Sequence, residues 1–278
     1  MTAVSFPPGR KRRATCLAAD RVGTSATYPL SADTVRPSGR VRSVVIFVHD
    51  VPALLTVDAV NMKFNQTRVL RNAALSVAEG ERVAVMGPSG SGKSTLLYIA
   101  LGLLKPQSGT VTFCGEPILN QSDRALSRWR RDNVGIVFQF GHLVQELTVA
   151  ENVQMPLLVR GGSRAEAASE ATRLIKHFGL GHISDRYPSQ ISGGELQRVA
   201  VARAAVHKPR VIFADEPTGA LDTVSGAAVL DLLLEVTGRG AGAALVMVTH
   251  DAEVAGRADR IVTVKDGRTS SDLSVAAL

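Results

Sequence analysis

Hydrophobic and polar positions divide the chain into short apolar runs, which are typical of strands, and longer stretches with helical periodicity. The runs predict strands at 54–60, 73–77, 83–86, 109–113, 134–138, 211–214, 244–248 and 260–264. The periodic stretches predict helices at 96–100, 125–129, 150–159, 164–178, 192–202 and 226–236. Because strands alternate with helices, we predict an α/β fold with a largely parallel sheet.

Two parts of the chain depart from this alternation. Residues 140–208 read mainly as helices, which predicts an inserted helical lobe within a folded domain that spans residues 51–278. Residues 1–50 are rich in Arg, Ser, Thr, Pro and Ala and lack steady periodicity until 44–48, so we expect a mostly disordered extension. A start site placed too early and a targeting segment are the alternatives for this basic, acid-poor stretch.

A glycine-rich stretch lies between the predicted strand at 83–86 and the predicted helix at 96–100 and fits G-x-x-x-x-G-K-[ST], the phosphate-binding pattern of nucleotide hydrolases. Its residues are Gly87, Pro88, Ser89, Gly90, Ser91, Gly92, Lys93, Ser94 and Thr95. Backbone N–H groups of such a loop, and of the helix start that follows, surround the β- and γ-phosphates. We expect Lys93 to place a cation on these phosphates and the Ser94 hydroxyl to be a Mg²⁺ ligand.

Two acids follow the apolar strand at 211–214. Successive side chains of a strand point to opposite faces, so Asp215 and Glu216 can have different roles at the carboxyl edge of the sheet. We expect Asp215 to hold Mg²⁺, through water, and Glu216 to polarise the attacking water. A solvated acidic turn is the alternative, and it would be favoured if the two acids stood alone.

Three more residues stand beside predicted strands, each with a structural alternative. His250 closes the strand at 244–248 and could contact the γ-phosphate, although a single His there is usually structural. Gln139 follows the strand at 134–138 and could orient water or the metal, or cap the strand. Phe64 could stack on a base or belong to the core. The joint occurrence of polar strand ends and a phosphate loop in one chain favours the functional interpretations of Gln139 and His250.

The run Ser192-Gly193-Gly194-Glu195 is a capping box at the start of a predicted helix. Two glycines in a first turn weaken a helix by roughly 1 kcal/mol each relative to alanine, which suggests that another group approaches the backbone closely. The exposed N–H groups, the Ser192 hydroxyl and the helix dipole would form a second anion site. The simplest assembly is then a head-to-tail pair in which each nucleotide lies between the loop of one subunit and this helix start of the other.

Composition adds few constraints. With 278 residues, of which 45% are hydrophobic, the chain can bury a large core, and no apolar run approaches the ~18 residues of a membrane span. The formal net charge is +7, but much of the excess lies near the N-terminus, so it says little about the folded part. Cys16 and Cys114 lack metal-ligand spacing, so we expect neither a disulfide framework nor a zinc site, and a reducing cytoplasm fits.

Taken together, residues 54–268 resemble the ATP-binding cassette (ABC) ATPases of membrane transporters. Ile191–Glu195 resembles their signature motif, and Val211–Glu216 resembles their Walker B motif. The other matching positions are the D-loop at Ala220–Asp222, the switch histidine His250, the Q-loop glutamine Gln139 and the adenine-stacking aromatic Phe64. The departures, at Ile191, Leu196 and Ala220, are mild and cast little doubt on hydrolysis.

Within this family, the chain looks most like the lipoprotein-releasing and macrolide-exporting group, whose members also resemble the cell-division ATPase. The matching positions are 137–140, Leu143, 147–148, 151–153 and 155–158. The rival class, a soluble ABC protein of translation or DNA repair, would be expected to carry two cassettes or a long coiled coil. A cell-division ATPase that signals without transport stays open, as does import in place of export.

The resemblance implies a P-loop NTPase fold with a mainly parallel core, an antiparallel β subdomain and an inserted α-helical subdomain. It implies an ATPase that uses ATP and Mg²⁺, with Gln139 among the metal-site residues and Ser192, Gly193, Gly194 and Asp222 at the nucleotide. It further implies a homodimer in the closed state under a separately encoded membrane permease, with no nucleic-acid partner. Its place would be cytoplasmic, peripheral on the inner face of the cell membrane, and the permease would set the substrate.

Overall fold

The computed structural model describes residues 53–240 and 242–274, so the extension predicted over residues 1–50 lies outside the described part. The first of two sheets is antiparallel and has the strand order β2-β1-β4-β5. Its strands are β1 (Ala53–Phe64), β2 (Thr67–Ala78), β4 (Ser108–Phe113) and β5 (Glu116–Pro117). Leu55 of β1 pairs with Val77 on one side and Phe113 on the other, so apolar positions of three strands face the same core.

The second sheet has six strands in the order β10-β9-β3-β8-β7-β6. They are β3 (Arg82–Met86), β6 (Val134–Val137), β7 (Val211–Asp215), β8 (Ala244–Val248), β9 (Arg260–Lys265) and β10 (Arg268–Ser274). All neighbouring pairs are parallel except β9 with β10, which confirms the prediction of a largely parallel sheet. The strands β3, β7 and β8 are buried almost throughout, because both faces of a parallel sheet are covered.

Seven α-helices connect the strands of the described part. They are α1 (Lys93–Ala100), α2 (Asp123–Asn133), α3 (Val149–Val159), α4 (Arg164–His177), α5 (Gly193–Ala205), α6 (Thr223–Val236) and α7 (Ala252–Ala255). Capping boxes start three of them, at Thr148, Ser163 and Ser192, and the last confirms the capping box predicted from the sequence. Two short 3₁₀ turns, Gly181–Ile183 and Pro188–Gln190, join α4 to α5.

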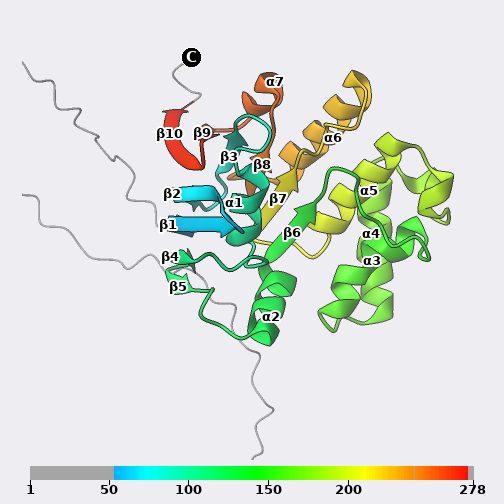
Figure 1. The fold of residues 1–278 in the computed structure, drawn as a ribbon. Coiled ribbons are helices and arrows are strands. Elements are labelled where there is room, and N and C mark those ends of the chain that lie inside the picture. The colour runs from blue at the N-terminus through cyan, green and yellow to red at the C-terminus, as the bar shows by residue number, and fades with distance from the viewer. Residues whose placement is uncertain (1–52, 241, 275–278) are drawn as a thin grey trace, which may run out of the picture. The chain divides into compact units, whose positions relative to one another are not determined.

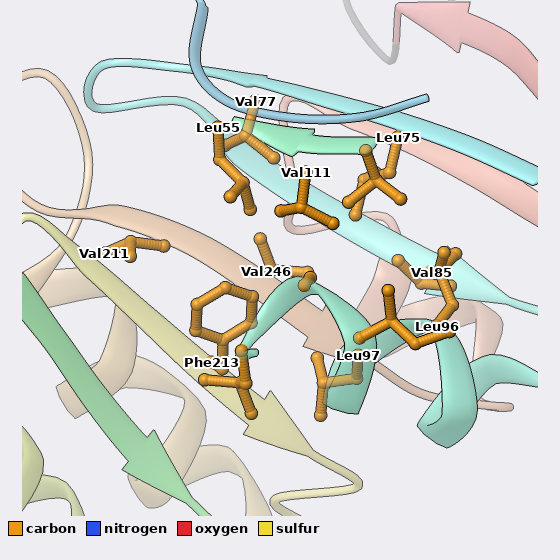
Figure 2. Close-up of a cluster of buried hydrophobic side chains, with 14 of the residues drawn as sticks. Leu55, Leu75, Val77, Val85, Leu96, Leu97, Val111, Val211, Phe213 and Val246 are labelled. Carbon is orange, nitrogen blue, oxygen red and sulfur yellow. The ribbon is translucent and has the colours of Figure 1, made fainter. Parts of the chain in front are cut away.

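The helix α1 lies between the two sheets. Figure 2 shows Leu96 and Leu97 of this helix near side chains of both sheets, among them Val85, Val111, Phe213 and Val246. Burial of each such aliphatic or aromatic side chain stabilises the folded state by roughly 1.5–3 kcal/mol. The glycine-rich loop that precedes α1 is therefore anchored to the rigid centre of the fold.

A second core lies around α5 and includes side chains from the lobe helices, from α6 and from β6, β7 and β8. The helix α5 packs against the lobe helices α3 and α4 and also against α6 and β6. In Figure 1, α3 and α4 lie across β6 from β1 and β2. The helical subdomain predicted over 140–208 thus shares its last helix with the core of the sheet, and its status as a separate unit stays a prediction.

The structure differs from the predicted elements mostly at polar segments. The strand β10 follows the turn at Asp266 and Gly267, and its sequence, Arg268–Ser274, carries one apolar residue, so no hydrophobic pattern marked it. As an edge strand it pairs with β9 alone in the described sheet. The helix α6 begins at Thr223, ahead of the predicted 226, because the Asp222 side chain accepts a hydrogen bond from the Ser225 N–H and caps it there.

Candidate active site

The glycine-rich loop has a backbone that depends on glycine at both ends. Gly87 has φ 153°, and a Cβ atom there would lie 2.1 Å from the carbonyl oxygen of Val264 in β9. Gly92 has φ 106° and is the N-cap residue of α1, where no side chain caps the helix. The first backbone N–H groups of α1 thus have no side-chain cap, which is the arrangement in which a helix N-terminus attracts anions.

Lys93 lies inside this loop. Its side chain is buried, and Nζ donates hydrogen bonds to the carbonyl oxygens of Gly87 at 2.9 Å and Pro88 at 3.0 Å. The Ser91 hydroxyl is also buried and has no hydrogen-bond partner among the described residues. A buried cation, an uncapped helix start and an unsatisfied hydroxyl in one loop fit a phosphate-bearing ligand.

The hydroxyls of Ser94 and Tyr98 meet the carboxylate of Asp215. Ser94 Oγ donates to Asp215 Oδ1 at 3.2 Å, and the Tyr98 hydroxyl donates to Oδ2 at 3.4 Å. Burial raises the pKa of Asp215, and the hydrogen bond from Ser94 opposes that rise. Burial also raises the pKa of Tyr98, with a further contribution from the Asp215 charge.

The oxygen atoms of Ser94 and Asp215 suit Mg²⁺, which usually takes one or two carboxylates and completes its shell with water and phosphate oxygens. Among the described residues, no group of three or more His, Cys, Asp and Glu side chains could hold a metal ion by itself. A metal at this place would therefore need ligands besides acidic side chains, such as the Ser94 hydroxyl and oxygen atoms from outside the chain.

Glu216 directly follows β7 and adopts a left-handed backbone conformation, with φ 46°. Its N–H donates to the carbonyl oxygen of Val248 at the end of β8. Its side-chain Oε2 lies 3.2 Å from Nδ1 of His250. A positive φ is strained for a residue with a long side chain, and such strain is often found where a side chain must point in a functionally required direction.

Gln139 comes close to Glu216 across Gly219. A Cβ atom at Gly219 would lie 3.1 Å from Glu216 Oε2 and 3.4 Å from Gln139 Nε2. Gly219 thus leaves free a small space that both the Gln139 amide and the Glu216 carboxylate border. The structure brings Gln139, Glu216 and His250 together from three different strand ends, as expected for the carboxyl edge of a parallel sheet.

The remaining residues of the predicted nucleotide site have varied surroundings. Phe64 ends β1 and its side chain is 46% exposed, so it is not part of the core. Pro88, Ser89 and Gly90 are exposed, and Thr95 is half-buried in α1. The β2 residues Val69 and Leu70 lie against Gly92, which places the start of β2 beside the glycine-rich loop. An exposed aromatic ring at the neighbouring β1–β2 turn is available for stacking.

The start of α5 is exposed at Ser192 and Gly193. The Ser192 hydroxyl accepts from the Glu195 N–H at 3.3 Å and donates to Glu195 Oε2 at 2.7 Å. Hydrogen bonds from the Ser192 N–H and hydroxyl lower the pKa of Glu195, and His182 Nε2, 3.1 Å from Oε1, adds to this effect. Ser192 therefore caps its own helix, as the capping box in the sequence predicts.

The two glycines of this helix start have different neighbours. A Cβ atom at Gly194 would lie 2.9 Å from Ser225 Oγ of α6, so the close approach expected from the sequence comes from the same chain. At Gly193 the nearest atom would be 3.8 Å away, which leaves room for an outside group. Asp222 accepts a hydrogen bond from the Ser225 N–H at 2.9 Å, and this bond lowers the pKa of Asp222.

Sequence reasoning missed Tyr98, Gly219 and two α5 residues, Gln197 and Arg203. Tyr98 follows Ser94 by four residues on α1, and side chains at this spacing share a helix face, so the signal was present. Gly219 touches Gln139, and Gln197 and Arg203 touch the loop at 138–142, across long sequence separations, so no local pattern marked them. Gln197 Nε2 donates to the Phe138 carbonyl, and Arg203 donates to the carbonyls of Gly141 and His142.

A cavity of about 440 Å³ lies beside the loop that carries Gln139, between β6, α2, α3 and α5. Its walls include the apolar side chains of Val144, Met155 and Val159 and the basic side chains of Arg131 and Arg203. Phe140, next to Gln139 in the chain, is 63% exposed.

Comparison with known proteins agrees with these features. Residues 70–219 match the family model described as ABC transporter. Over 218 residues the chain is 46% identical to the lipoprotein-releasing system ATP-binding protein LolD of Shewanella denitrificans, covering 77% of this chain and 93% of that protein. It is 44% identical to LolD of Shewanella oneidensis over 218 residues, with 77% and 94% covered.

Solved structures give the same picture. The ATP-binding cassette MJ0796, as a dimer in a post-hydrolysis state bound to ADP and Pi, is 38% identical, with a TM-score of 0.73, covering 80% of this chain and 98% of that one. The cbiO1 protein of Clostridium perfringens, part of the transporter complex cbiONQ, is 28% identical, with the same TM-score, covering 81% and 90%. No helix among the described residues is long and apolar enough to cross a membrane.

Proposed function

Because the chain belongs to the ABC transporter family and is an ATPase of that family, we propose that it powers a lipoprotein-releasing type of exporter, as a head-to-tail pair beneath a separate membrane subunit. The observation that carries the proposal is the meeting of Ser94, Asp215, Glu216, His250 and Gln139 beside the phosphate loop.

The phosphate loop would bind ATP through its backbone N–H groups and Lys93. In the structure Lys93 Nζ donates to two carbonyls of the loop, so its cation is held within the loop that would surround the phosphates. Phe64 would stack on the adenine, since its ring is exposed at the end of β1. Asp222, Gly193, Gly194 and Ser192 would approach the nucleotide only from a second subunit.

Ser94 and Asp215, with Gln139 nearby, would hold Mg²⁺, which supplies charge neutralisation on the phosphates when it is bound. Asp215 is oriented by two hydroxyl donors, so its oxygen atoms are held in place before any ligand arrives. We infer a metal site here because carboxylate and hydroxyl oxygen atoms are suitable ligands for Mg²⁺.

Glu216 would accept the proton of the attacking water, because its carboxylate stands at the carboxyl edge of the sheet with its side chain about a quarter exposed. His250 would orient that carboxylate and contact the γ-phosphate, since its Nδ1 lies 3.2 Å from Glu216 Oε2. Gln139 would help to place the water, because its amide lies across Gly219 from the same carboxylate.

A head-to-tail dimer is supported by the placement of α1 and α5. The helix α1 packs on β1, β2, β7 and β8, whereas α5 packs on α3, α4, α6 and β6. The exposed Ser192 and Gly193 at the start of α5 would then serve the phosphates bound by the other subunit. The cassette MJ0796, which is 38% identical over 98% of its length, is described as dimeric, and this supports a dimer for the present chain.

The membrane subunit would dock at the cavity beside the Gln139 loop. This cavity lies between the sheet strand β6 and the lobe helix α3, so a segment seated in it would contact both parts and the loop between them. Lipoprotein release is supported by 46% identity to a lipoprotein-releasing system ATP-binding protein over 93% of its length. The chain would accordingly work in the cytoplasm, on the inner face of the membrane.

The proposal is tested by purifying the chain with the membrane protein that co-purifies with it and placing both in lipid vesicles that carry a labelled lipoprotein. We expect release of the lipoprotein that requires ATP and Mg²⁺ and is lost in Glu216→Gln. Stimulation of ATP hydrolysis by the membrane partner with no lipoprotein movement would contradict an exporter and favour the cell-division type of signalling ATPase.

A further inference from the structure

The loop that carries Gln139 is held by side chains of the lobe helices. Residues 138–148 form no helix or strand between β6 and α3. Their backbone polar groups need partners, because an unpaired buried carbonyl costs roughly 1–3 kcal/mol. The partners near Gln139 come from α5, the helix that begins at Ser192.

Gln197 holds the residue just before Gln139. Its side chain is 1% exposed, and Nε2 donates to the carbonyl oxygen of Phe138 at 2.8 Å. A buried amide of this kind has a single orientation in which it satisfies its partner. Gln197 therefore fixes the end of β6 relative to α5 at the point where the chain turns into Gln139.

Arg203 holds the two residues that follow Phe140. Its guanidinium donates to the carbonyl oxygens of Gly141 at 2.7 Å and His142 at 2.8 Å. Burial lowers the pKa of Arg203, yet arginine keeps its charge in proteins, so both bonds are charge-assisted. The planar fork of the side chain sets the direction of both carbonyls at once.

The backbone of this loop also packs directly against α5. Gly141 has φ 68°, and a Cβ atom there would lie 2.2 Å from Cδ2 of Leu196. The loop backbone therefore contacts α5 through Leu196 and is hydrogen-bonded to it on both sides of Gln139. The side chain of Gln139, in turn, reaches the space beside Glu216 across Gly219.

We propose that Gln197 and Arg203 are positioning residues, which clamp the Gln139 loop to α5 so that the Gln139 amide stands beside Glu216. The proposal rests on the catalytic role proposed for Gln139. The helix α5 starts at Ser192, which would serve the nucleotide of the other subunit in a dimer. The clamp therefore ties the Gln139 amide of one nucleotide site to the helix that contributes to the other site. A shift of α5 then moves Gln139 as well.

The clamp should affect turnover more than ATP binding. The phosphate loop and Lys93 bind ATP without help from α5, whereas a misplacement of a catalytic group by 1 Å can cost about a hundredfold in rate. We expect Arg203→Met to lower kcat by about tenfold or more, with the KM for ATP changed less than about threefold. Arg203→Lys, which keeps the charge but lacks the planar fork, should recover part of the loss.

A double-mutant cycle with Gln139→Ala separates positioning from a general structural role. If Arg203 acts through Gln139, adding Arg203→Met to Gln139→Ala should change kcat by less than about twofold. If the double variant instead lost kcat by the product of the two single-variant factors, the proposed clamp would be overturned. A wild-type kcat for Gln139→Ala would instead remove the role of Gln139, and the clamp with it, so the two failures give different results.

Arg130→Met is the matched control, because Arg130 Nη1 donates to the Gly102 carbonyl at 2.9 Å, in a loop away from Gln139. It should lower the melting temperature by an amount similar to Arg203→Met and leave kcat nearly unchanged. Equal losses of kcat in both variants would contradict a specific clamp. If Arg203→Met is too unstable to purify, the double-mutant cycle with Gln139→Ala can be measured with Gln197→Met or Arg203→Lys in its place.

Discussion

His250 Nδ1 lies 3.2 Å from Glu216 Oε2, which links the residues that follow two neighbouring parallel strands. Asp215 at the end of β7 pairs with Val248 at the end of β8, so the residues just beyond both strands must meet at one edge of the sheet. At this distance the imidazole nitrogen and the carboxylate oxygen are close enough for each side chain to constrain the orientation of the other. The pair therefore has the geometry of a base and the group that orients it.

We predict that Glu216→Gln retains Mg-ATP binding, loses nearly all turnover and accumulates as an ATP-bound dimer. The amide keeps the shape of the side chain but cannot accept a proton from water. Size-exclusion chromatography with and without ATP, beside a turnover assay, tests this. Turnover close to that of the wild type would remove Glu216 from the role of general base.

Gly219→Ala should lower turnover by about tenfold, because the new Cβ would lie 3.1 Å from Glu216 Oε2, which is tight enough to displace the carboxylate, and would also contact Gln139 Nε2. Stability should hardly change, since Gly219 is exposed. Gly240→Ala is the matched control, because a Cβ there meets nothing within 4 Å. Steady-state ATPase rates of the three proteins test the prediction, and equal rates for both variants would contradict it.

Tyr98→Phe should raise the Mg²⁺ concentration needed for half-maximal ATPase activity by about threefold to tenfold. The variant removes one of the two hydroxyl donors that orient Asp215 and leaves the aromatic ring in place. A Mg²⁺ titration at saturating ATP measures the change. An unchanged titration curve would mean that the Ser94 hydroxyl alone orients the carboxylate.

The buried centre of the fold was predictable from the sequence. Runs such as 211–214 and 244–248 are apolar throughout because a parallel sheet covers both faces of its strands, and such runs are visible without a structure. The strand β10 was not visible, because an edge strand has little apolar surface to bury and its sequence is polar.

The same distinction applies to the candidate site. Asp215 ends the strand β7, His250 follows the strand β8, and Ser94 lies in the first turn of α1. Their place at a common edge of the sheet therefore followed from the alternation of strands and helices. Gly219 matters through its approach to Gln139, and Arg203 through its bond to Gly141, and only the folded chain shows contacts between residues so distant in sequence. Their proposed chemical roles stay predictions.

Glu195→Ala should destabilise the protein at neutral pH by about 1 kcal/mol, through loss of the capping box at Ser192. The folded-state pKa of Glu195 lies below its ordinary value, so its contribution is present above the unfolded pKa of about 4.5 and is lost as the pH falls through the folded pKa. Urea unfolding of both proteins at several pH values tests this. A difference that persists undiminished in acid would contradict the assignment to the carboxylate.

The last prediction concerns the head-to-tail dimer. Ser192→Arg should bind ATP as a monomer nearly as well as the wild type, because the phosphates are held by Lys93, Ser94 and the loop of the same subunit. It should nevertheless block dimer closure. A long side chain at the exposed start of α5 would fill the space beside Gly193 that the γ-phosphate of the other subunit must approach. Lys93→Ala, by contrast, should lose ATP binding in its own subunit.

Mixing the two inactive variants gives the discriminating measurement. In a heterodimer of Ser192→Arg with Lys93→Ala, both defects fall on one composite site, since the loop of one subunit faces the helix start of the other. The second composite site then has an intact loop and an intact helix start, so part of the activity should return if one site can turn over alone. Monomeric Ser192→Arg that failed to bind ATP would show instead that Ser192 acts only as a cap within its own chain. The head-to-tail arrangement would then lose its main support.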